Sequence, residues 1–429
     1  MEMVINRCPI PVSVVGFGSS ARTFHLPFIL SLPDHFKLHS IQQRPGSKSG
    51  PPASSTHPDV AIASSFEEVI SGPTALPKPG LVVITTSNAT HFPFAKAALQ
   101  AGYHVIVEKP ITWRVSEAEE LVSLSASLGL VCASFNNRRW DCDFLTVKSL
   151  LAPPVANPEQ PSALGTPVYY ESRFDRFRPW SKGGWREESG FDEGGGLLLD
   201  LGSHLADQLI SLFGPPKTIT AFVTNQRGQL SANVDDDFLI IAQYPPTRPL
   251  PPDEPGAGSR LSGLRAVLGA TVLSTHIDAE QPRFRIEGNR GSYEKRGTDP
   301  QENQLKKGWT PAKQGQAFGV YEEHEPPAIK LGRLTTSLDA GSEAVNSGSG
   351  APGAAPVQPK LAVNDVPTLP GLYAIKAGES ARNGSGSVEA AYRAIDQVLV
   401  VKPQEAAQCI KFLNLARQSA LEGRTIEWE

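Results

Sequence analysis

The stretch GGGLLLDLGSHLADQL, residues 194–209, contains three polar side chains at helical spacing among leucines. Asp200 and His204 are four residues apart and Asp207 follows three residues later, so on one helix all three would share a face. Histidine transfers protons easily near neutral pH, and a carboxylate one turn away can orient it. Asp200 and His204 are therefore candidate catalytic residues. The alternative is a hydrogen-bonded core histidine with charges near helix ends.

A lysine follows another apolar run. Lys109 comes directly after HVIVE, in the motif Glu108-Lys109-Pro110. A side chain at the carboxyl end of a parallel strand lies near the crevice where doubly wound sheets bind their ligands. Its ammonium could polarise a substrate hydroxyl or stabilise a developing alkoxide. Lys109 is the third candidate catalytic residue, although a solvated surface lysine would look the same in sequence.

The segment VVGFGSSA, residues 14–21, matches the spacing G-x-G-x-x-A through Gly16, Gly18 and Ala21. In a dinucleotide site the first glycine permits a tight turn, the second lets the backbone approach the pyrophosphate, and the third small residue lets the helix pack closely. The motif stands between two predicted strands and opens a predicted helix, which is the context it requires. A glycine-rich turn without a ligand is the alternative.

The carboxylate that usually binds the ribose of NAD after such a motif is absent. The second predicted strand ends in Gln42, Gln43 and Arg44. A guanidinium can bind a 2′-phosphate through charge-assisted hydrogen bonds, whereas a carboxylate would repel it. We therefore expect NADP rather than NAD as the cofactor. The alternative is that Arg44 only begins a solvated loop.

Two further stretches, NNRRWDCDF (136–144) and ESRFDRFRPW (171–180), are rich in Arg, Asp, Asn and aromatic residues. Hydroxyl groups need hydrogen-bond donors and acceptors, and sugar rings pack on aromatic faces, so such mixtures suit a polyol. They would also suit a phosphate or a salt-linked surface. The candidate substrate-binding residues are Asn137, Arg138, Trp140 and Asp175.

Alternating strands and helices would place the glycine motif and Lys109 on one sheet. Repeated β-α-β units imply a parallel sheet covered by helices on both faces. The fold class is therefore α/β, with an N-terminal Rossmann doubly wound parallel sheet in residues 1–134. Its predicted strands are 11–15, 36–43, 80–86, 104–109 and 130–135.

Residues 135–429 are predicted to form a C-terminal α/β domain for substrate binding and oligomerisation, with a large open, mainly antiparallel sheet. Helices are predicted over 195–214 and 402–423. The predicted strands are 167–177, 218–225, 237–244 and 291–297. Stretches rich in Pro, Gly, Ser and Ala predict low-complexity insertions near 152–165, 245–260 and 338–360.

The composition limits the kinds of partner. Hydrophobic residues make up 40% and charged residues 20% of 429 residues, an ordinary soluble composition for two domains. A net charge of −4 gives no reason to expect nucleic acid or a membrane as partner. No apolar run approaches the ~18 residues of a membrane span. The four cysteines lack C-x-x-C spacing, so we expect no metal site and reduced thiols in the cytoplasm.

Together, VVGFGSSA, TTSNATHFPFAKAALQAGYHVIVEKP and GGGLLLDLGSHLADQL resemble the Gfo/Idh/MocA oxidoreductase family. The resemblance is closest to the branch of NADP-dependent scyllo-inositol dehydrogenases. That closer match depends on longer strings, which are far more specific than a glycine fingerprint. They are FNNRRWDCDFLTVKSLL, ESRFDRFRP, WREESG and GNRGSYEKRGTDPQE.

The resemblance implies residue roles. Lys109 matches a lysine that contacts substrate and nicotinamide, His204 matches the proton-transferring histidine, and Asp200 matches the aspartate one turn before it. It also implies a homodimer or homotetramer assembled through the second sheet. The motifs and the resemblance together give these cofactor-binding residues: Gly16, Gly18, Ala21, Arg44, Thr86, Asn88, His91, Glu108 and Lys109.

We therefore expect an NADP-dependent oxidoreductase that moves hydride between nicotinamide and a secondary hydroxyl or ketone of a cyclic polyol or sugar. His204 would remove the hydroxyl proton, Lys109 would stabilise the alkoxide, and Asp200 would orient His204 or bind a neighbouring hydroxyl. Two alternatives remain on this fold: a non-catalytic regulator that binds NAD(P) or sugar, and a dehydrogenase for an open-chain or dihydrodiol substrate.

Overall fold

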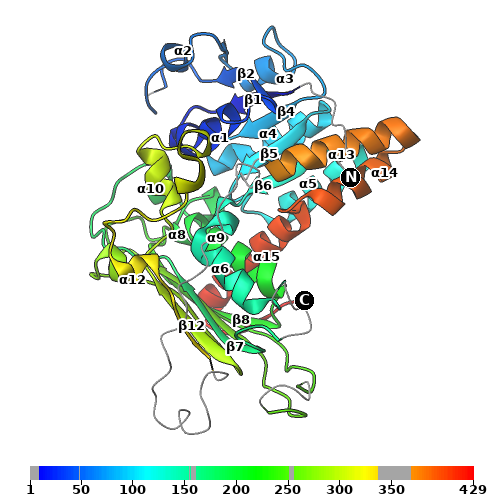
Figure 1. The fold of residues 1–429 in the computed structure, drawn as a ribbon. Coiled ribbons are helices and arrows are strands. Elements are labelled where there is room, and N and C mark those ends of the chain that lie inside the picture. Colours follow the sequence, from blue (N-terminus) through cyan, green and yellow to red (C-terminus); the bar gives the residue numbers. More distant parts are fainter. Residues whose placement is uncertain (1–8, 48, 154, 156–160, 251–255, 337–368) are drawn as a thin grey trace. The chain divides into compact units, whose positions relative to one another are not determined.

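The computed structural model describes residues 9–47, 49–153, 155, 161–250, 256–336 and 369–429. The chain divides into two compact units (Figure 1). The first unit consists of the described residues within Met1–Asn137, Gln301–Gly319 and Leu361–Ile410. The second consists of the described residues within Arg138–Pro300, Val320–Lys360 and Lys411–Glu429.

The first unit is built on a six-stranded sheet in the order β3-β2-β1-β4-β5-β6, with every neighbouring pair parallel. This arrangement confirms the predicted Rossmann sheet. The strand order reverses between β1 and β4, the point at which doubly wound sheets bind ligands beyond the strand ends. The strands are β1 Ile10–Val15, β2 Phe36–Gln42, β3 Ala61–Ala63, β4 Leu81–Ile84, β5 His104–Glu108 and β6 Cys132–Phe135.

Successive strand residues point to opposite sides of this sheet. Because both faces carry apolar side chains, helices cover both of them. On one face, Val12 and Val14 of β1 pack with the π-helical turn η1 and helix α1. On the other face, Val15 packs in a second core with α3, α4 and α5. The helical elements are η1 Ala21–His25, α1 Leu26–Leu30, α2 Ala53–Thr56, α3 Phe66–Ile70, α4 Asn88–Gln100 and α5 Val115–Leu128.

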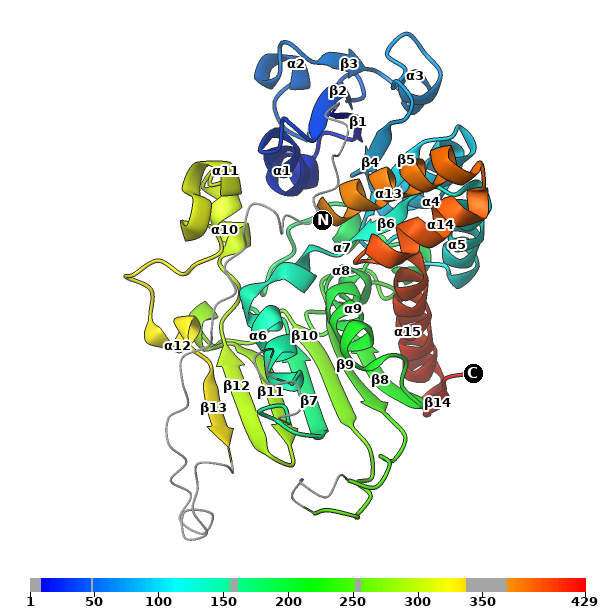
Figure 2. The same ribbon diagram turned by 45° about the vertical axis from the view of Figure 1, so that its right-hand side comes forward.

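Two later parts of the chain complete the first unit, although the sequence prediction placed all of 135–429 in the second domain. Leu305, Phe318, Ile375 and Ile395 are buried in the same core as Val12. Figure 2 shows the hairpin of α13 and α14 beside α5. These contacts are too distant in sequence for a local pattern to reveal. The helices are α10 Gln301–Lys306, α11 Pro311–Gln314, α13 Leu369–Ser385 and α14 Val388–Val398. Helix α15, Pro403–Glu422, belongs to this unit up to Ile410 and to the second unit from Lys411.

The second unit contains an eight-stranded sheet in the order β13-β12-β11-β7-β10-β9-β8-β14. Only β7 and β10 pair in parallel among its described neighbours, which confirms the predicted large, mainly antiparallel sheet. The strands are β7 Pro167–Arg173, β8 Thr218–Thr224, β9 Asp237–Gln243, β10 Arg265–Thr271, β11 Pro282–Gly288, β12 Gly291–Arg296, β13 Arg333–Thr336 and β14 Ile426–Glu427.

Helices cover one face of this second sheet (Figure 2). Phe238 of β9 and Leu268 of β10 are buried on the side where α9 packs. Phe222 of β8 is 60% exposed on the other side. The sheet therefore has one covered and one open face. The helices of the second unit are α6 Cys142–Leu151, α7 Trp185–Glu188, α8 Leu197–Asp200, α9 Gly202–Phe213 and α12 Pro327–Lys330.

The predicted low-complexity insertions lie only partly within the described residues. Residues 338–360 lie outside them. In the stretch 245–260, the described ends pair through their backbones, since the Leu250 N–H donates to the Ser259 carbonyl at 2.8 Å. In 152–165, the described end closes a turn in which the Gly165 N–H donates to the Ser162 carbonyl at 3.1 Å.

Candidate functional site

The glycine motif follows β1, and its three small residues have different surroundings. Gly16 has φ +93°, and a Cβ there would lie 3.0 Å from Thr86 Cγ2 and 3.2 Å from the Thr85 carbonyl carbon. Only glycine suits this close approach of β1 and β4. Ala21 is fully buried under the sheet. A Cβ at Gly18 would meet no atom within 4 Å, so the backbone there is open and fits a pyrophosphate.

Side-chain hydrogen bonds hold parts of the loop after β2, which carries Arg44. Gln43 Oε1 accepts a hydrogen bond from the Ala53 N–H at 2.7 Å. Arg22 Nη1 donates to the Ser49 carbonyl at 2.9 Å and so links this loop to the glycine-turn helix. Arg44 is exposed. Arg22 is not among the residues expected from the sequence, because no motif spacing connects it with the loop.

His91 joins the loops that follow β4 and β5. Its Nδ1 lies 2.8 Å from the Pro110 carbonyl oxygen and its Nε2 lies 3.1 Å from the Thr86 carbonyl oxygen. A carbonyl oxygen can only accept, and a neutral imidazole has one N–H, so the ring nitrogen that carries the proton donates to the carbonyl facing it. Asn88 is buried at the start of α4. The structure therefore brings Thr86, Asn88 and His91 to the Glu-Lys-Pro motif.

The Glu108 carboxylate is bound by side chains of the glycine-turn helix. Its Oε1 accepts from the Ser20 hydroxyl and pairs with His25 Nε2 at 2.9 Å. Its Oε2 accepts from the Lys109 N–H at 3.1 Å. Burial by itself would raise the pKa of Glu108, but His25, the Ser20 hydrogen bond and the Lys109 charge lower it to about 2. Glu108 thus links the glycine turn to the backbone of Lys109.

Ser20 and His25 are absent from the residues expected from sequence. His25 is fully buried, and its ring centre lies 4.0 Å from that of Phe135. Ser20 and His25 lie at and just after the glycine motif. Their partner, Glu108, lies 88 and 83 residues further along the chain. A histidine four residues after the small residue of the motif was the available signal.

Asp200, His204 and Asp207 lie on two successive helices, whereas sequence analysis predicted one helix over 195–214. The break falls at Leu201, between α8 and α9. The His204 N–H still donates to the Leu201 carbonyl at 3.1 Å, so the chain keeps turning. Asp200 and His204 therefore remain one turn apart. The buried His204 ring lies edge-on to Phe174, with 6.3 Å between ring centres.

The two carboxylates beside His204 have different partners. Asp207 is buried and accepts two hydrogen bonds from Arg139, at 2.8 Å from Nε and 2.6 Å from Nη2. A buried bidentate pair of this kind fixes structure, because removing either partner would leave a buried charge. Asp200 lies 3.2 Å from Arg186 Nε, in a pair exposed to solvent. Asp200 is thus the accessible carboxylate.

The ring of Phe174, in one of the two predicted substrate-binding strings, contacts several functional side chains. The Arg283 guanidinium lies 4.0 Å and that of Arg138 lies 5.6 Å from its ring centre, in addition to the His204 contact. Cationic groups stack favourably on aromatic rings. Arg138 is thereby brought close to the helix of His204. Phe174 stood in the string ESRFDRFRPW, but no spacing rule distinguished it from its neighbours.

The other three predicted substrate residues are placed as follows. Asp175 pairs with Arg173, with 2.6 Å between Nε and Oδ2, and accepts the Thr271 N–H at 3.1 Å. Its carboxylate therefore connects β7 with β10. Asn137 and Trp140 bound a single 3₁₀ turn, Asn137–Trp140, and both are partly buried.

The described residues also bear on metal binding and on membrane spanning. They contain no group of three or more His, Cys, Asp or Glu side chains that could hold a metal ion. None of the helices in this part of the chain is both long and apolar enough to cross a membrane.

The two units match two family models. Residues 10–135 match the model described as an oxidoreductase family with an NAD-binding Rossmann fold. Residues 160–294 match the model of the GFO/IDH/MocA C-terminal domain.

Similar proteins agree with these matches. An uncharacterised oxidoreductase of Escherichia coli K12, YdgJ, is 40% identical over 299 residues, which are 70% of this chain and 75% of the relative. The scyllo-inositol 2-dehydrogenase (NADP(+)) IolW of Bacillus subtilis 168 is 28% identical, with 98% of this chain and 96% of the relative covered. The solved structure of an oxidoreductase from Bacillus cereus has a TM-score of 0.68 and 25% identity, covering 98% and 99% of the two chains.

A parallel sheet with an open glycine turn and a second unit with a mixed sheet define a Rossmann-type oxidoreductase. The chain belongs to the Gfo/Idh/MocA oxidoreductase family, which confirms the resemblance expected from sequence.

Proposed function

We propose that this protein transfers hydride between NADP and a secondary hydroxyl or ketone of a cyclic polyol or sugar. The observation that carries the proposal is the position of an accessible Asp200 one helical turn before the buried His204. The name of the Bacillus subtilis relative, an NADP-dependent scyllo-inositol dehydrogenase, supports the same substrate class.

In this proposal each candidate residue has one role. His204 removes the proton from the reacting hydroxyl and returns it in the reverse direction. Lys109 stabilises the alkoxide with its ammonium, and its backbone is held through Glu108. Asp200 binds a neighbouring hydroxyl of the substrate. Substrate contacts from Asn137, Arg138 and Trp140 remain part of the proposal.

The first unit fits a dinucleotide. The open backbone at Gly18 would hold the pyrophosphate, and Thr86, Asn88 and His91 would border the nicotinamide end together with Glu108 and Lys109. When bound, the nicotinamide supplies the redox chemistry.

We further propose that NADP is preferred over NAD. No carboxylate occupies residues 36–44, and Arg44 is exposed in the loop after β2. Arg22 and Ser49 hold this loop through a hydrogen bond of 2.9 Å. The exposed guanidinium of Arg44 suits a 2′-phosphate.

The experiment that tests the proposal follows the absorbance of NADPH and NADH with a panel of inososes and sugar ketones. We expect oxidation of NADPH by at least one cyclic polyol ketone. Firm NADPH binding without oxidation by any ketone would contradict the proposal and favour a non-catalytic regulator. Arg44→Ala should weaken NADPH binding but not NADH binding, and Lys37→Ala, which removes an exposed cation from the preceding strand β2, is the control. A roughly tenfold or larger preference for NAD would contradict the cofactor assignment.

Assembly and location are further parts of the proposal. The open sheet face with its exposed Phe222 suits a contact between copies of the chain, so we propose a homodimer or homotetramer. Light scattering of the purified chain tests this directly.

A reducing, cytoplasmic setting suits the buried free thiols of Cys132, Cys142 and Cys409. Burial raises the pKa of Cys132 to about 12, so that thiol stays protonated.

A further inference from the structure

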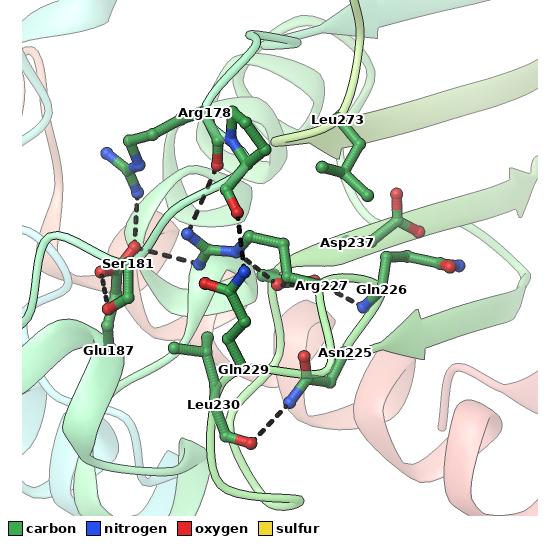
Figure 3. A network of polar contacts seen from close by, with 12 residues as sticks. Arg178, Ser181, Glu187, Asn225, Gln226, Arg227, Gln229, Leu230, Asp237 and Leu273 are labelled. Carbon is green, nitrogen blue, oxygen red and sulfur yellow. Dashed lines mark hydrogen bonds and ion pairs between the residues drawn. The ribbon is translucent and has the colours of Figure 1, made fainter.

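A network of charged side chains holds the segment between β7 and α8 (Figure 3). Glu187 accepts hydrogen bonds from Arg178 at 2.7 Å, from Arg227 at 3.1 Å and from the Ser181 hydroxyl at 2.8 Å. It also accepts the Lys182 N–H at 2.6 Å. The Glu187 carboxylate thereby binds several groups of the segment between β7 and α8 at once.

Arg227 anchors this turn to a second loop. Its side chain is only 1% exposed and pairs with Asp236, with 2.7 Å between Nε and Oδ2. Its Nη1 donates to the Trp180 carbonyl at 2.8 Å. Two guanidinium groups, of Arg178 and Arg227, thus balance the carboxylates of Glu187 and Asp236. Buried charges are stable only when paired and hydrogen-bonded, so the network holds the segment in one conformation.

The supported segment presents Arg186 to Asp200. The Arg186 carbonyl accepts the Gly196 N–H at 2.9 Å, directly before α8. Its Nε lies 3.2 Å from Asp200 Oδ1, and its guanidinium lies 4.4 Å from the ring centre of Trp185. Both the backbone and the side chain of Arg186 are therefore placed beside the helix that leads to His204.

Stability does not explain why this ion pair is so firmly supported. Arg186 is 50% and Asp200 is 26% exposed, and exposed ion pairs contribute little to folding because water screens them. The buried Arg139–Asp207 pair nearby has the opposite character. A rigid support beneath a solvent-accessible pair is better suited to binding a ligand than to holding the fold.

We infer that Arg186 and Asp200 together recognise two adjacent hydroxyl groups, so that the substrate is a vicinal diol of the cyclic polyol class. A carboxylate only accepts hydrogen bonds and a guanidinium only donates them. Neighbouring hydroxyls can satisfy both, one donating to Asp200 and the other accepting from Arg186. This inference rests on the proposed function and adds Arg186 as a specificity-determining residue.

The test measures binding without turnover, by ligand-observed NMR on the full chain with NADPH present, because the reduced cofactor cannot accept a hydride from an alcohol probe. The probes are scyllo-inositol, trans-cyclohexane-1,2-diol and cyclohexanol. Arg186→Ala should weaken both diols by about 10- to 100-fold, the range for hydrogen bonds to charged groups, and leave cyclohexanol unchanged. Arg186→Lys keeps the charge but loses the planar fork, so we expect an intermediate loss. Arg296→Ala removes a similarly exposed ion pair, with Glu294, and should change nothing.

The outcomes separate this inference from the proposed function. Equal diol binding by wild type and Arg186→Ala, or a wild type that binds diols no better than cyclohexanol, overturns the inference. If diol binding depends on Arg186 but no ketone oxidises NADPH, the inference stands and the proposed reaction fails. If NADPH is oxidised, Arg186→Ala should lower kcat/KM for a dihydroxy ketone more than for cyclohexanone; equal losses overturn the inference.

Discussion

Glu108 and His25 form a buried pair in the nucleotide-binding unit, with 2.9 Å between Oε1 and Nε2. Glu108 lies at the end of β5 and accepts the N–H of Lys109, whereas His25 ends the π-helical turn that follows the glycine motif. The pair therefore connects the dinucleotide turn with the backbone of the candidate catalytic lysine. We regard His25 and Glu108 as positioning residues for Lys109.

Loss of either partner should slow the reaction. We expect His25→Ala and Glu108→Gln to lower kcat by roughly 10- to 100-fold, because small displacements of a catalytic group are costly. Steady-state kinetics with saturating NADPH checks this. His104→Ala is the matched control, since His104 is equally buried at the other end of β5 and accepts the Val131 N–H at 3.0 Å. That variant should lose stability but keep kcat. A normal kcat in His25→Ala would contradict the positioning role.

The two glycines of the motif should respond differently to an added methyl group. Gly18→Ala places the methyl in open space, so the free energy of unfolding should not change while NADPH binding weakens by about tenfold or more. Gly16→Ala forces a non-glycine residue to φ +93° against Thr85 and Thr86, which should cost about 1–3 kcal/mol. Urea unfolding and NADPH fluorescence titration distinguish the two. Unchanged NADPH affinity in Gly18→Ala would mean that the pyrophosphate does not bind there.

Removal of the proposed acid–base group should affect turnover rather than cofactor binding. His204→Ala should lower kcat by about 10²–10⁴-fold, the usual contribution of general acid–base catalysis. NADPH affinity should stay close to that of wild type, as measured by fluorescence. His324→Ala, which removes an exposed histidine of the same unit, serves as the control. Wild-type turnover in His204→Ala would refute the assignment.

The Glu187 network predicts a specific dependence of stability on pH. Burial alone would raise the pKa of Glu187, but hydrogen bonds from Ser181, Arg227 and the Lys182 N–H, with the charge of Arg178, lower it from 4.5 to about 2. A carboxylate whose pKa is lowered by folding stabilises the protein above its unfolded pKa. That stabilisation is lost as the pH falls from 4.5 toward 2.

Glu187→Gln should therefore destabilise the protein by about 2 kcal/mol at neutral pH, and by progressively less as the medium becomes acidic. Urea unfolding at a series of pH values checks the difference between variant and wild type. Glu188→Gln is the matched control, because Glu188 is exposed and accepts the Gly184 N–H at 2.8 Å. A difference that stays constant down to pH 2 would show that the charge of Glu187 is not responsible.

Local patterns were sufficient for much of the first unit. Gly16, Gly18 and Ala21 could be assigned because a tight turn imposes residue size over a few neighbouring positions. Lys109 could be placed at a strand end because a short apolar run defines its own boundary.

Long-range packing decided the rest. The segments 301–319 and 369–410 join the first unit because residues such as Leu305 and Ile375 are buried against its sheet. The break at Leu201 also went unpredicted, since the leucines around it fit a continuous helix.

The sequence by itself determined the fold class, the oxidoreductase family and the candidate residues Lys109, Asp200 and His204, because these depend on contiguous motifs. Only the tertiary structure showed that Glu108 is held by Ser20 and His25, and that Arg186 is brought to Asp200 by Glu187 and Arg227. Charged side chains find their partners by distance in space. That distance is not encoded in the spacing of residues along the chain.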